Sequence, residues 1–199
     1  MNPFKQTSEA GNLNSFSERL GVGEHTVIVD HLEYKPAWNK KLNDKFGMSS
    51  VEFVILESTT HKVNDRRGDA WHIGNPGSGG ENNRKRFNQF GQALTESIGG
   101  DATKPEVVAK NLETMTEFDE SIGRSKAAGR KFPGRGVVLR VSVTERPDKS
   151  GVVYRNNVYA TIAQNKEQIT ARRNQIESVA KKPEPASAPT ETSSLDGVL

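Results

Sequence analysis

The sequence contains no cysteine, few aromatic residues and no long apolar run. The absence of cysteine excludes disulfide bridges, thiolate zinc sites and cysteine nucleophiles. No apolar stretch approaches the roughly 18–20 residues that a membrane-spanning helix needs, and the first residues do not follow the pattern of a secretory signal. Hydrophobic residues make up only 33% of the 199 residues, which predicts a modest core with polar loops or unfolded ends. We therefore expect a soluble, cytoplasmic protein.

Negative charge is concentrated at the C-terminal end of the chain. From Pro183 onward the sequence has three acids, Glu184, Glu191 and Asp196, and neither lysine nor arginine. Because the net charge is +3, residues 1–182 carry about +6. A basic body with an acidic end suits a polyanionic partner, although many soluble proteins carry such a charge.

Alternating apolar and polar residues predict five strands. They are expected at Glu24–Lys35, Met48–Thr59, Asp69–Gly74, Gly136–Glu145 and Gly151–Ile162. Asp30 interrupts the alternation of the first strand, which indicates a bend or bulge there. The polar segment Pro36–Gly47 is expected to be a loop, and the turn before Gly151 contains Pro and Asp, which favours a hairpin between the last two strands.

Helical spacing of apolar residues predicts two helices between the third and fourth strands. The first contains Phe87, Phe90 and Leu94, and the second covers Lys104–Gly123. Two further helices are expected at Asn14–Gly21 and Lys166–Lys182. The predicted fold class is mainly β with a helical insert: a five-stranded OB-fold barrel, with helices between strands 3 and 4 and a disordered tail. The expected divisions are an arm (1–22), an OB-fold nucleic-acid-binding domain (23–163), a charged helix or linker (164–182) and a disordered acidic tail (183–199).

A glycine-rich stretch, Gly74–Gly80, stands directly ahead of the basic first helix. A P-loop that starts at Gly74 would need Lys and Ser or Thr where Gly80 and Glu81 stand. We therefore interpret the glycines as a connection from strand to helix, whose backbone N–H groups still suit contact with one phosphate.

Other catalytic and cofactor patterns find little support. The histidines form no H-E-x-x-H pair, and no G-x-S-x-G elbow occurs. We expect neither a metal nor a cofactor, and a protein that is not an enzyme. A nuclease or recombination enzyme built from scattered acids stays open as an alternative.

Basic residues interleaved with aromatics are the main functional signal. A cationic groove that follows phosphates, with aromatic rings that stack on bases, is the typical surface for single-stranded nucleic acid. In an OB-fold this surface lies on strands 2 and 3 and on the loops joining strands 1–2 and 4–5. The expected phosphate-binding residues are Lys40, Lys41, Arg66, Arg67, Arg130, Lys131 and Arg140. The expected stacking residues are Trp38, Trp71 and Tyr154. Tyr154 and Tyr159 fall on opposite faces of one strand, so at most one of the two is expected to stack.

The order of these motifs resembles a group of phage-encoded OB-fold single-stranded DNA-binding proteins. The resemblance covers Gly23 to Ile162 and rests on "GEHTVIVDHLEYKP", "SSVEFVILEST", "GDAWHIGNPG", "RFNQFGQALTESIG" and "GRGVVLRVSVTERPDKSGVVYRNNVYATI". It implies sequence-tolerant coating of single strands in replication, recombination or repair, in the host cytoplasm, without catalysis.

The resemblance also implies an acidic tail that recruits partner enzymes. Here Asp196, Val198 and Leu199 are the candidates, although "SSLDGVL" has only one acid near its end. A phage structural or adaptor protein stays open as a further alternative. So do binding to RNA and assembly into a homo-oligomer.

Overall fold

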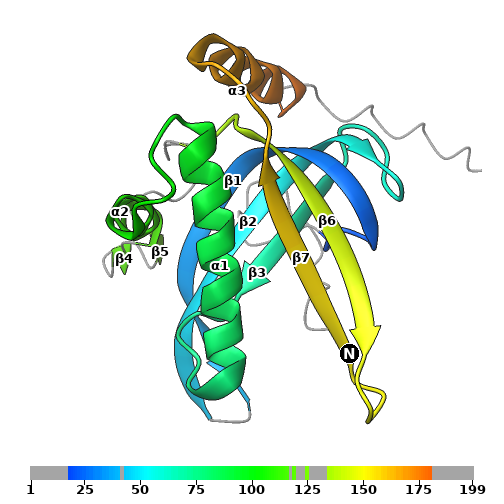
Figure 1. Ribbon diagram of the computed structural model, residues 1–199, viewed down its shortest axis with the longest axis vertical. Helices are drawn as coiled ribbons and strands as arrows, with labels where there is room; N and C mark the ends of the chain where they lie inside the picture. The colour runs from blue at the N-terminus through cyan, green and yellow to red at the C-terminus, as the bar shows by residue number, and fades with distance from the viewer. Residues whose placement is uncertain (1–17, 41–42, 117, 120–123, 126–133, 181–199) are drawn as a thin grey trace, which may run out of the picture.

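A computed structural model describes residues 18–40, 43–116, 118–119, 124–125 and 134–180. Its elements are β1 (Gly23–Asn39), β2 (Asp44–Ser58), β3 (Arg66–Trp71), α1 (Gly77–Ser97), α2 (Pro105–Thr116), β4 (Phe118–Asp119), β5 (Arg124–Ser125), β6 (Val138–Pro147), β7 (Val153–Thr161) and α3 (Lys166–Ala180). Figure 1 shows α1 and α2 beside the sheet and α3 at one end of the molecule. The N-terminal residues 1–17 and the predicted tail lie outside the described residues.

Five strands form one antiparallel sheet in the order β3-β2-β1-β6-β7. The prediction of a mainly β fold with two helices before the last strand pair is confirmed. The second predicted helix was too long, because α2 ends at Thr116 and Phe118–Asp119 begins a small hairpin with Arg124–Ser125. Apolar spacing in this segment was compatible with either structure.

The first strand bends where the sequence interrupts its alternation. The register between β1 and β2 shifts between Val29 and His31, which leaves Asp30 without a partner on β2. The bulge predicted at Asp30 is therefore confirmed. Beyond it, β1 and β2 stay paired as far as Asn39 and Asp44. The loop predicted at Pro36–Gly47 is wrong, because β1 continues to Asn39 and β2 begins at Asp44.

The main core lies between the inner face of the sheet and α1. Phe53 on β2 and Phe90 and Leu94 on α1 are fully buried, and the rings of Phe53 and Phe90 meet edge to face, 6.5 Å apart. The glycines predicted to precede this helix instead form its first turn, which begins at Gly77.

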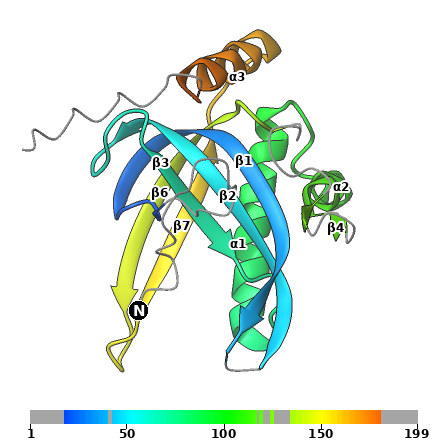
Figure 2. The same cartoon turned by 180° about the vertical axis from the view of Figure 1, so that it is seen from behind.

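A second, smaller core lies on the outer face of the sheet. Ile176 of α3 packs there against Ile28 of β1, Val54 of β2 and Val138 of β6. The charged helix predicted at Lys166–Lys182 is confirmed as far as Ala180. Figure 2 shows α3 crossing one end of the sheet, away from the ends of the two long hairpins.

Strands β3 and β7, at the two edges of the sheet, are linked by side chains. No backbone ladder joins them within the described residues, so barrel closure is not part of the observed pairing. The carboxylate of Asp69 on β3 accepts hydrogen bonds from Asn157 and Tyr159 on β7, each at 2.5 Å, and from Arg86 on α1 at 3.2 Å. Burial, and then the charge of Asp69, raise the pKa of Tyr159 well above its usual value.

Residues 18–21, which we call the strap, run alongside β3. The amide of Gly68 donates to the carbonyl of Glu18 at 3.0 Å, and Arg19 bridges to Gly68. The helix predicted at Asn14–Gly21 is therefore wrong for its described part. Two histidines hold Gly21: its N–H donates to Nε2 of His61 at 2.6 Å, and its carbonyl accepts from Nε2 of His25 at 2.9 Å.

None of the helices among the described residues combines the length and the apolar character needed to cross a membrane.

Candidate nucleic-acid interface

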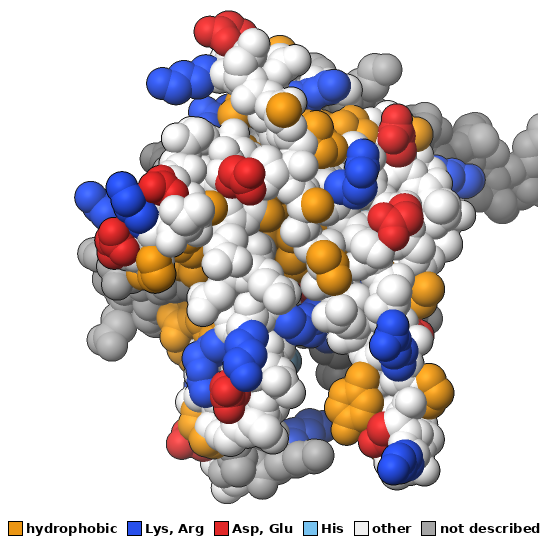
Figure 3. Space-filling model, viewed as in Figure 1, with side chains coloured by type: hydrophobic (Ala, Val, Ile, Leu, Met, Phe, Trp, Pro, Cys, Tyr) orange, Lys and Arg blue, Asp and Glu red, His pale blue; other side chains and the backbone are white. Residues whose placement is uncertain are grey.

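Two hairpins extend past the body of the sheet toward the same end of the molecule (Figures 1 and 2). The first, the β1–β2 arm, pairs Tyr34–Asn39 with Asp44–Ser49. The second, the β6–β7 arm, runs from Thr144 to Asn156, beyond the last pairing of β6 with β1 at Val143. Figure 3 shows two lobes at this end with a recess between them, and lysine or arginine side chains on both lobes.

The β1–β2 arm depends on close backbone approach at one glycine pair. The amide of Gly74 donates to the carbonyl of Gly47 at 2.8 Å. A Cβ at Gly74 would lie 2.4 Å from the nitrogen of Gly47, so only glycine fits. This contact ties the start of α1 to the arm, while the ring of Tyr34 covers the other space around Gly47.

Lysines mark the end of the β1–β2 arm. Lys40 and Lys45 are both exposed, and Lys45 is the register partner of Trp38. The backbone of Trp38 is part of β1, whereas its side chain and the whole of Lys41 lie outside the described residues. The structure thus brings Lys40 to the arm as predicted and adds Lys45, which sequence reasoning missed because it was assigned to a loop without a defined face.

The β6–β7 arm is held by a compact turn. The carboxylate of Asp148 accepts hydrogen bonds from the amides of Ser150 at 2.8 Å and Val152 at 2.9 Å, and from the Ser150 hydroxyl at 2.6 Å. The hydrogen bond from the Ser150 hydroxyl is the main reason why the pKa of Asp148 is lowered. The hairpin predicted here is confirmed, and it carries the exposed cations Arg146 and Lys149.

The two tyrosines of β7 lie on opposite faces of the strand, as the alternation of the sequence predicted. Tyr159 is buried in the core, whereas Tyr154 is 61% exposed. Tyr154 lies directly opposite Arg146 in the register of β6 and β7. Arg140, further along β6, is also exposed. Both predicted residues, Arg140 and Tyr154, are therefore on the surface, on the outer face of the arm and its supporting strands.

Two predicted phosphate ligands are engaged by acids instead. Arg66 donates to Asp30 at 2.7 Å and also to Glu52. Burial alone would lower the pKa of Arg66, but these two carboxylates raise it. Arg67 pairs with Asp65 at 3.2 Å. Because Asp30 is far from Arg66 in the sequence, the motif "DRRGD" gave no sign of this pairing.

Trp71 belongs to the core. It is fully buried, with its ring centroid 5.2 Å from Phe87, 5.1 Å from Phe90 and 6.0 Å from Tyr159. The prediction that Trp71 stacks on bases is wrong, because no face of its ring reaches the surface.

Arg19, His72 and Arg155 lie close together where β3, β7 and the strap meet, with the acids Asp69 and Glu145 beside Arg155. Burial, and secondarily the charge of Arg19, lower the pKa of His72. Burial also lowers the pKa of Arg155, against the opposing charge of Asp69. Arg155 donates to the carbonyl of Leu20 and to Asn157 at 3.1 Å. Arg155 lies on the inner face of β7, which it shares with Asn157 and Tyr159.

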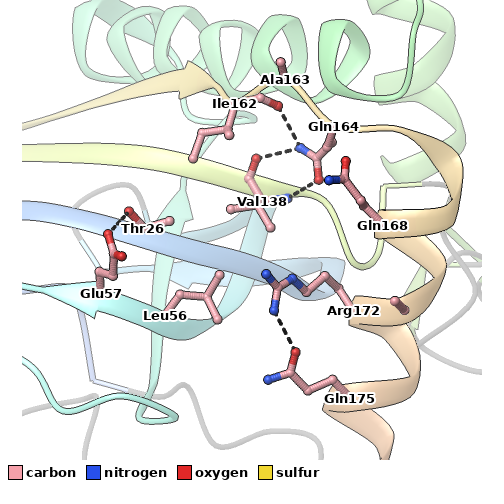
Figure 4. Close-up of a pocket in the computed structure, with 11 residues that line it drawn as sticks. Thr26, Leu56, Glu57, Val138, Ile162, Ala163, Gln164, Gln168, Arg172 and Gln175 are labelled. Atoms are coloured by element: carbon pink, nitrogen blue, oxygen red, sulfur yellow. Dashed lines mark hydrogen bonds between the residues drawn. The ribbon is translucent and has the colours of Figure 1, made fainter.

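A groove of about 470 Å³ lies between α3 and the outer face of the sheet. Figure 4 shows Gln164 at its edge, where the side-chain amide bonds both the N–H and the carbonyl of Val138, at 3.0 and 2.9 Å. Arg172 donates to Gln175 at 2.9 Å, and both residues lie on α3, along one side of this groove. Gln164 thereby continues the pairing of β6 after β7 has ended.

The remaining predicted residues lie outside the described part of the chain: Arg130, Lys131, Asp196, Val198 and Leu199. Among the described residues, no group of three or more His, Asp or Glu side chains is arranged to hold a metal ion. Neither protein-family models nor curated protein sequences match this chain.

Proposed function

We propose that this protein binds single-stranded DNA without sequence preference, in the recess between the two arms, and coats single strands in phage replication, recombination or repair. The observation that carries the proposal is the pair of cation-bearing hairpins that extend toward one end of the molecule, with a recess between them. The protein acts in this proposal by binding, without catalysis.

The strand order supports this interpretation. An OB-fold is a five-stranded, partly open Greek-key barrel that binds oligonucleotides with strands 2 and 3 and the loops joining strands 1–2 and 4–5. The order β3-β2-β1-β6-β7 corresponds to such a barrel opened between its third and fifth strands. The tips of the β1–β2 and β6–β7 arms then stand where the two binding loops of an OB-fold stand.

The chemistry of the arms suits this ligand. Lys40 and Lys45 on one arm, and Lys149 on the other, supply exposed cations for phosphates. Tyr154 supplies an exposed ring on the outer face of the β6–β7 arm, outside the recess itself, and stacking of a base on such a ring contributes about 1–3 kcal/mol. Trp38 stays a proposed stacking residue because its backbone lies in the β1–β2 arm.

The experiment is a fluorescence anisotropy titration of a labelled dT oligonucleotide, and of a matched duplex, at low and moderate salt. We expect saturable binding of the single strand, weaker binding of the duplex, and a logarithm of the binding constant that falls linearly with the logarithm of salt concentration. A double variant, K45E with K149E, should weaken binding about tenfold or more, because it places two carboxylates beside the phosphates.

Lys62→Glu is the control, since Lys62 is an exposed lysine in the connection between β2 and β3. It should change the affinity by less than about threefold. Absence of single-strand binding at low salt would overturn the proposal and favour an adaptor protein. Loss of full-length DNA in Mg²⁺ or Mn²⁺ would favour a nuclease.

A further inference from the structure

The outer face of the β6–β7 pair is a bare sheet surface. It presents Arg140, Thr144 and Arg146 from β6 and Tyr154, Asn156 and Val158 from β7, and we call these residues the hairpin outer face. All of them are exposed. Helix α3 covers the neighbouring part of the same side of the sheet as far as Val138, but it leaves the hairpin outer face uncovered.

No carboxylate stands at the outward positions of these two strands. Ser142 and Ala160 complete the alternation, so the surface combines two arginines with small, polar and apolar side chains. The nearest acid on the adjoining strand is Glu24 of β1, whose carboxylate accepts a hydrogen bond from Ser142 at 2.5 Å. Arg140 and Arg146 form no ion pair with another described residue, which leaves both guanidinium groups available to an anionic ligand.

The register spaces these groups along a line. Arg140 and Arg146 are separated by six positions of a regular strand, about 20 Å at the usual rise per residue, which is long enough for several nucleotides. Tyr154 lies opposite Arg146, and Val158 lies opposite Ser142 between the two arginines. Tyr154 is 61% exposed and Val158 49% exposed. Cations at both ends, with an aromatic ring beside one of them and an apolar side chain between them, match what a single strand requires.

This surface is continuous with the recess around the end of the β6–β7 arm. Lys149 is exposed in the turn that separates the two, and the hydrogen bonds of Asp148 hold the backbone of this turn in one conformation. A flexible anionic polymer lying in the recess can therefore meet a cation at the turn and then the first arginine of the outer face, Arg146.

We propose that the hairpin outer face binds a second stretch of the same DNA strand, which passes from the recess over the turn at Lys149 and runs toward Arg140. This inference rests on the proposed function and extends it, since it divides the ligand between two surfaces. Short oligonucleotides occupy the recess alone. Longer ones also occupy the hairpin outer face and gain affinity, because the second contact is made within one complex.

The test compares two double variants with the same change in charge and residue type. R140E with V158E alters the hairpin outer face. K62E with V63E alters an exposed lysine and a valine that is 61% exposed in the connection between β2 and β3. All four positions are on the surface, so both variants should keep the unfolding midpoint of the unaltered protein. Binding constants are measured for a dT series of increasing length, within the range that forms one-to-one complexes.

We expect the affinity of the unaltered protein to rise with length. R140E with V158E should bind the shortest ligands within about twofold of the unaltered protein but lose about tenfold or more on the longest. K62E with V63E should follow the unaltered protein throughout. Unchanged binding at every length, or equal weakening at every length, would overturn the second surface while leaving the recess in place. If the unaltered protein binds no single strand at all, the proposed function itself has failed.

Discussion

The outer surface of the sheet has two halves, one covered by α3 and the other exposed. On one half, Arg66 and the buried Arg135 are surrounded by acids, with Asp30 between them, and α3 lies over the strands. On the other half, Arg140 and Arg146 stand on bare strands with no carboxylate at the outward positions of β6 and β7. An arginine on a strand therefore stabilises the fold where distant parts of the sequence bring acids to it. Where no acid is brought to it, the arginine is available to bind a ligand.

The covered half works as a connected network. Asp30 accepts from Arg135 at 3.0 Å as well as from Arg66, and Arg135 continues to Glu177 of α3 at 2.9 Å. Only 3% of Arg135 is exposed, so its charge depends on these partners for stabilisation. The bare half has no comparable constraint, which is why its residues are suitable for substitution without loss of the fold.

The largest difference between the halves should follow from removing Asp30. Asp30→Ala leaves the buried guanidinium of Arg135 without its main partner, and breaking a buried pair in this way costs about 3–5 kcal/mol of unfolding free energy. Arg140→Ala on the bare half should cost less than about 0.5 kcal/mol. Urea denaturation of both variants measures the contrast. Equal costs would show that Asp30 and Arg135 are not the buried network described.

Apolar contacts should show the same contrast at a smaller scale. Ile176→Ala removes the side chain that seats α3 on Ile28 and Val54, and we expect a loss of about 2–3 kcal/mol, at the lower end for a buried isoleucine. Val158→Ala, on the bare half, should be close to neutral. Hydrogen exchange of the α3 amides should accelerate in the first variant only. Unchanged exchange would mean that other contacts hold the helix.

The boundary between the halves can be tested at Gln164. Gln164→Ala removes its two hydrogen bonds to the backbone of Val138, and we expect a cost of about 1–2 kcal/mol, since each such bond contributes about 0.5–1.5 kcal/mol. Thr144→Ala is the matched change on the bare half and should cost less than about 0.5 kcal/mol. A chemical denaturation series that ranks Thr144 above Gln164 would contradict the assignment of this boundary.

The smallest expected effect lies at His61, whose ring holds Gly21 of the strap. Burial, and then the charges of Arg67 and His25, lower the pKa of His61 from its ordinary 6.5. Because the unfolded chain binds the proton more readily, the stability that neutral His61 contributes is present above about pH 6.5 and is lost as pH falls through its folded pKa.

This loss is measured as the fall in thermal unfolding midpoint between pH 7.5 and 5.5. The fall should be larger in the unaltered protein than in His61→Gln, which keeps an acceptor for the amide of Gly21 but does not titrate. We expect a difference of about 1 °C or more. Equal falls in both proteins would locate the pH response elsewhere.

The sequence predicted the presence of the strands and helices better than the residues at which they begin and end. Strong alternation identified the last two strands and the bulge at Asp30, because burial on one face leaves a period of two. The β1–β2 arm was missed for the converse reason. Its residues Pro36–Asn39 and Asp44–Gly47 show no sustained alternation of apolar and polar residues, so the polar composition of the segment resembled a loop.

The candidate site shows the same limit. The exposed positions of Tyr154 and Arg140 could be predicted because alternation along a strand assigns each side chain to a face. Arg66 and Trp71 were misassigned because their environment is made by Asp30, Phe87 and Phe90, which the fold brings from other elements. Lys149 was within reach of sequence reasoning, since it lies in the turn that was already predicted. Lys45 was not, because its strand was not recognised.

The unpaired residue at the centre of β1 has a mechanical consequence. Asp30 is where β1 leaves the pairing with β6 and continues toward the β1–β2 arm with β2 alone. Its carboxylate is also anchored, through Arg135, to Glu177 on α3. The bend of β1 and the attachment of α3 therefore depend on the same residue, so a substitution of Asp30 alters both ends of the molecule together.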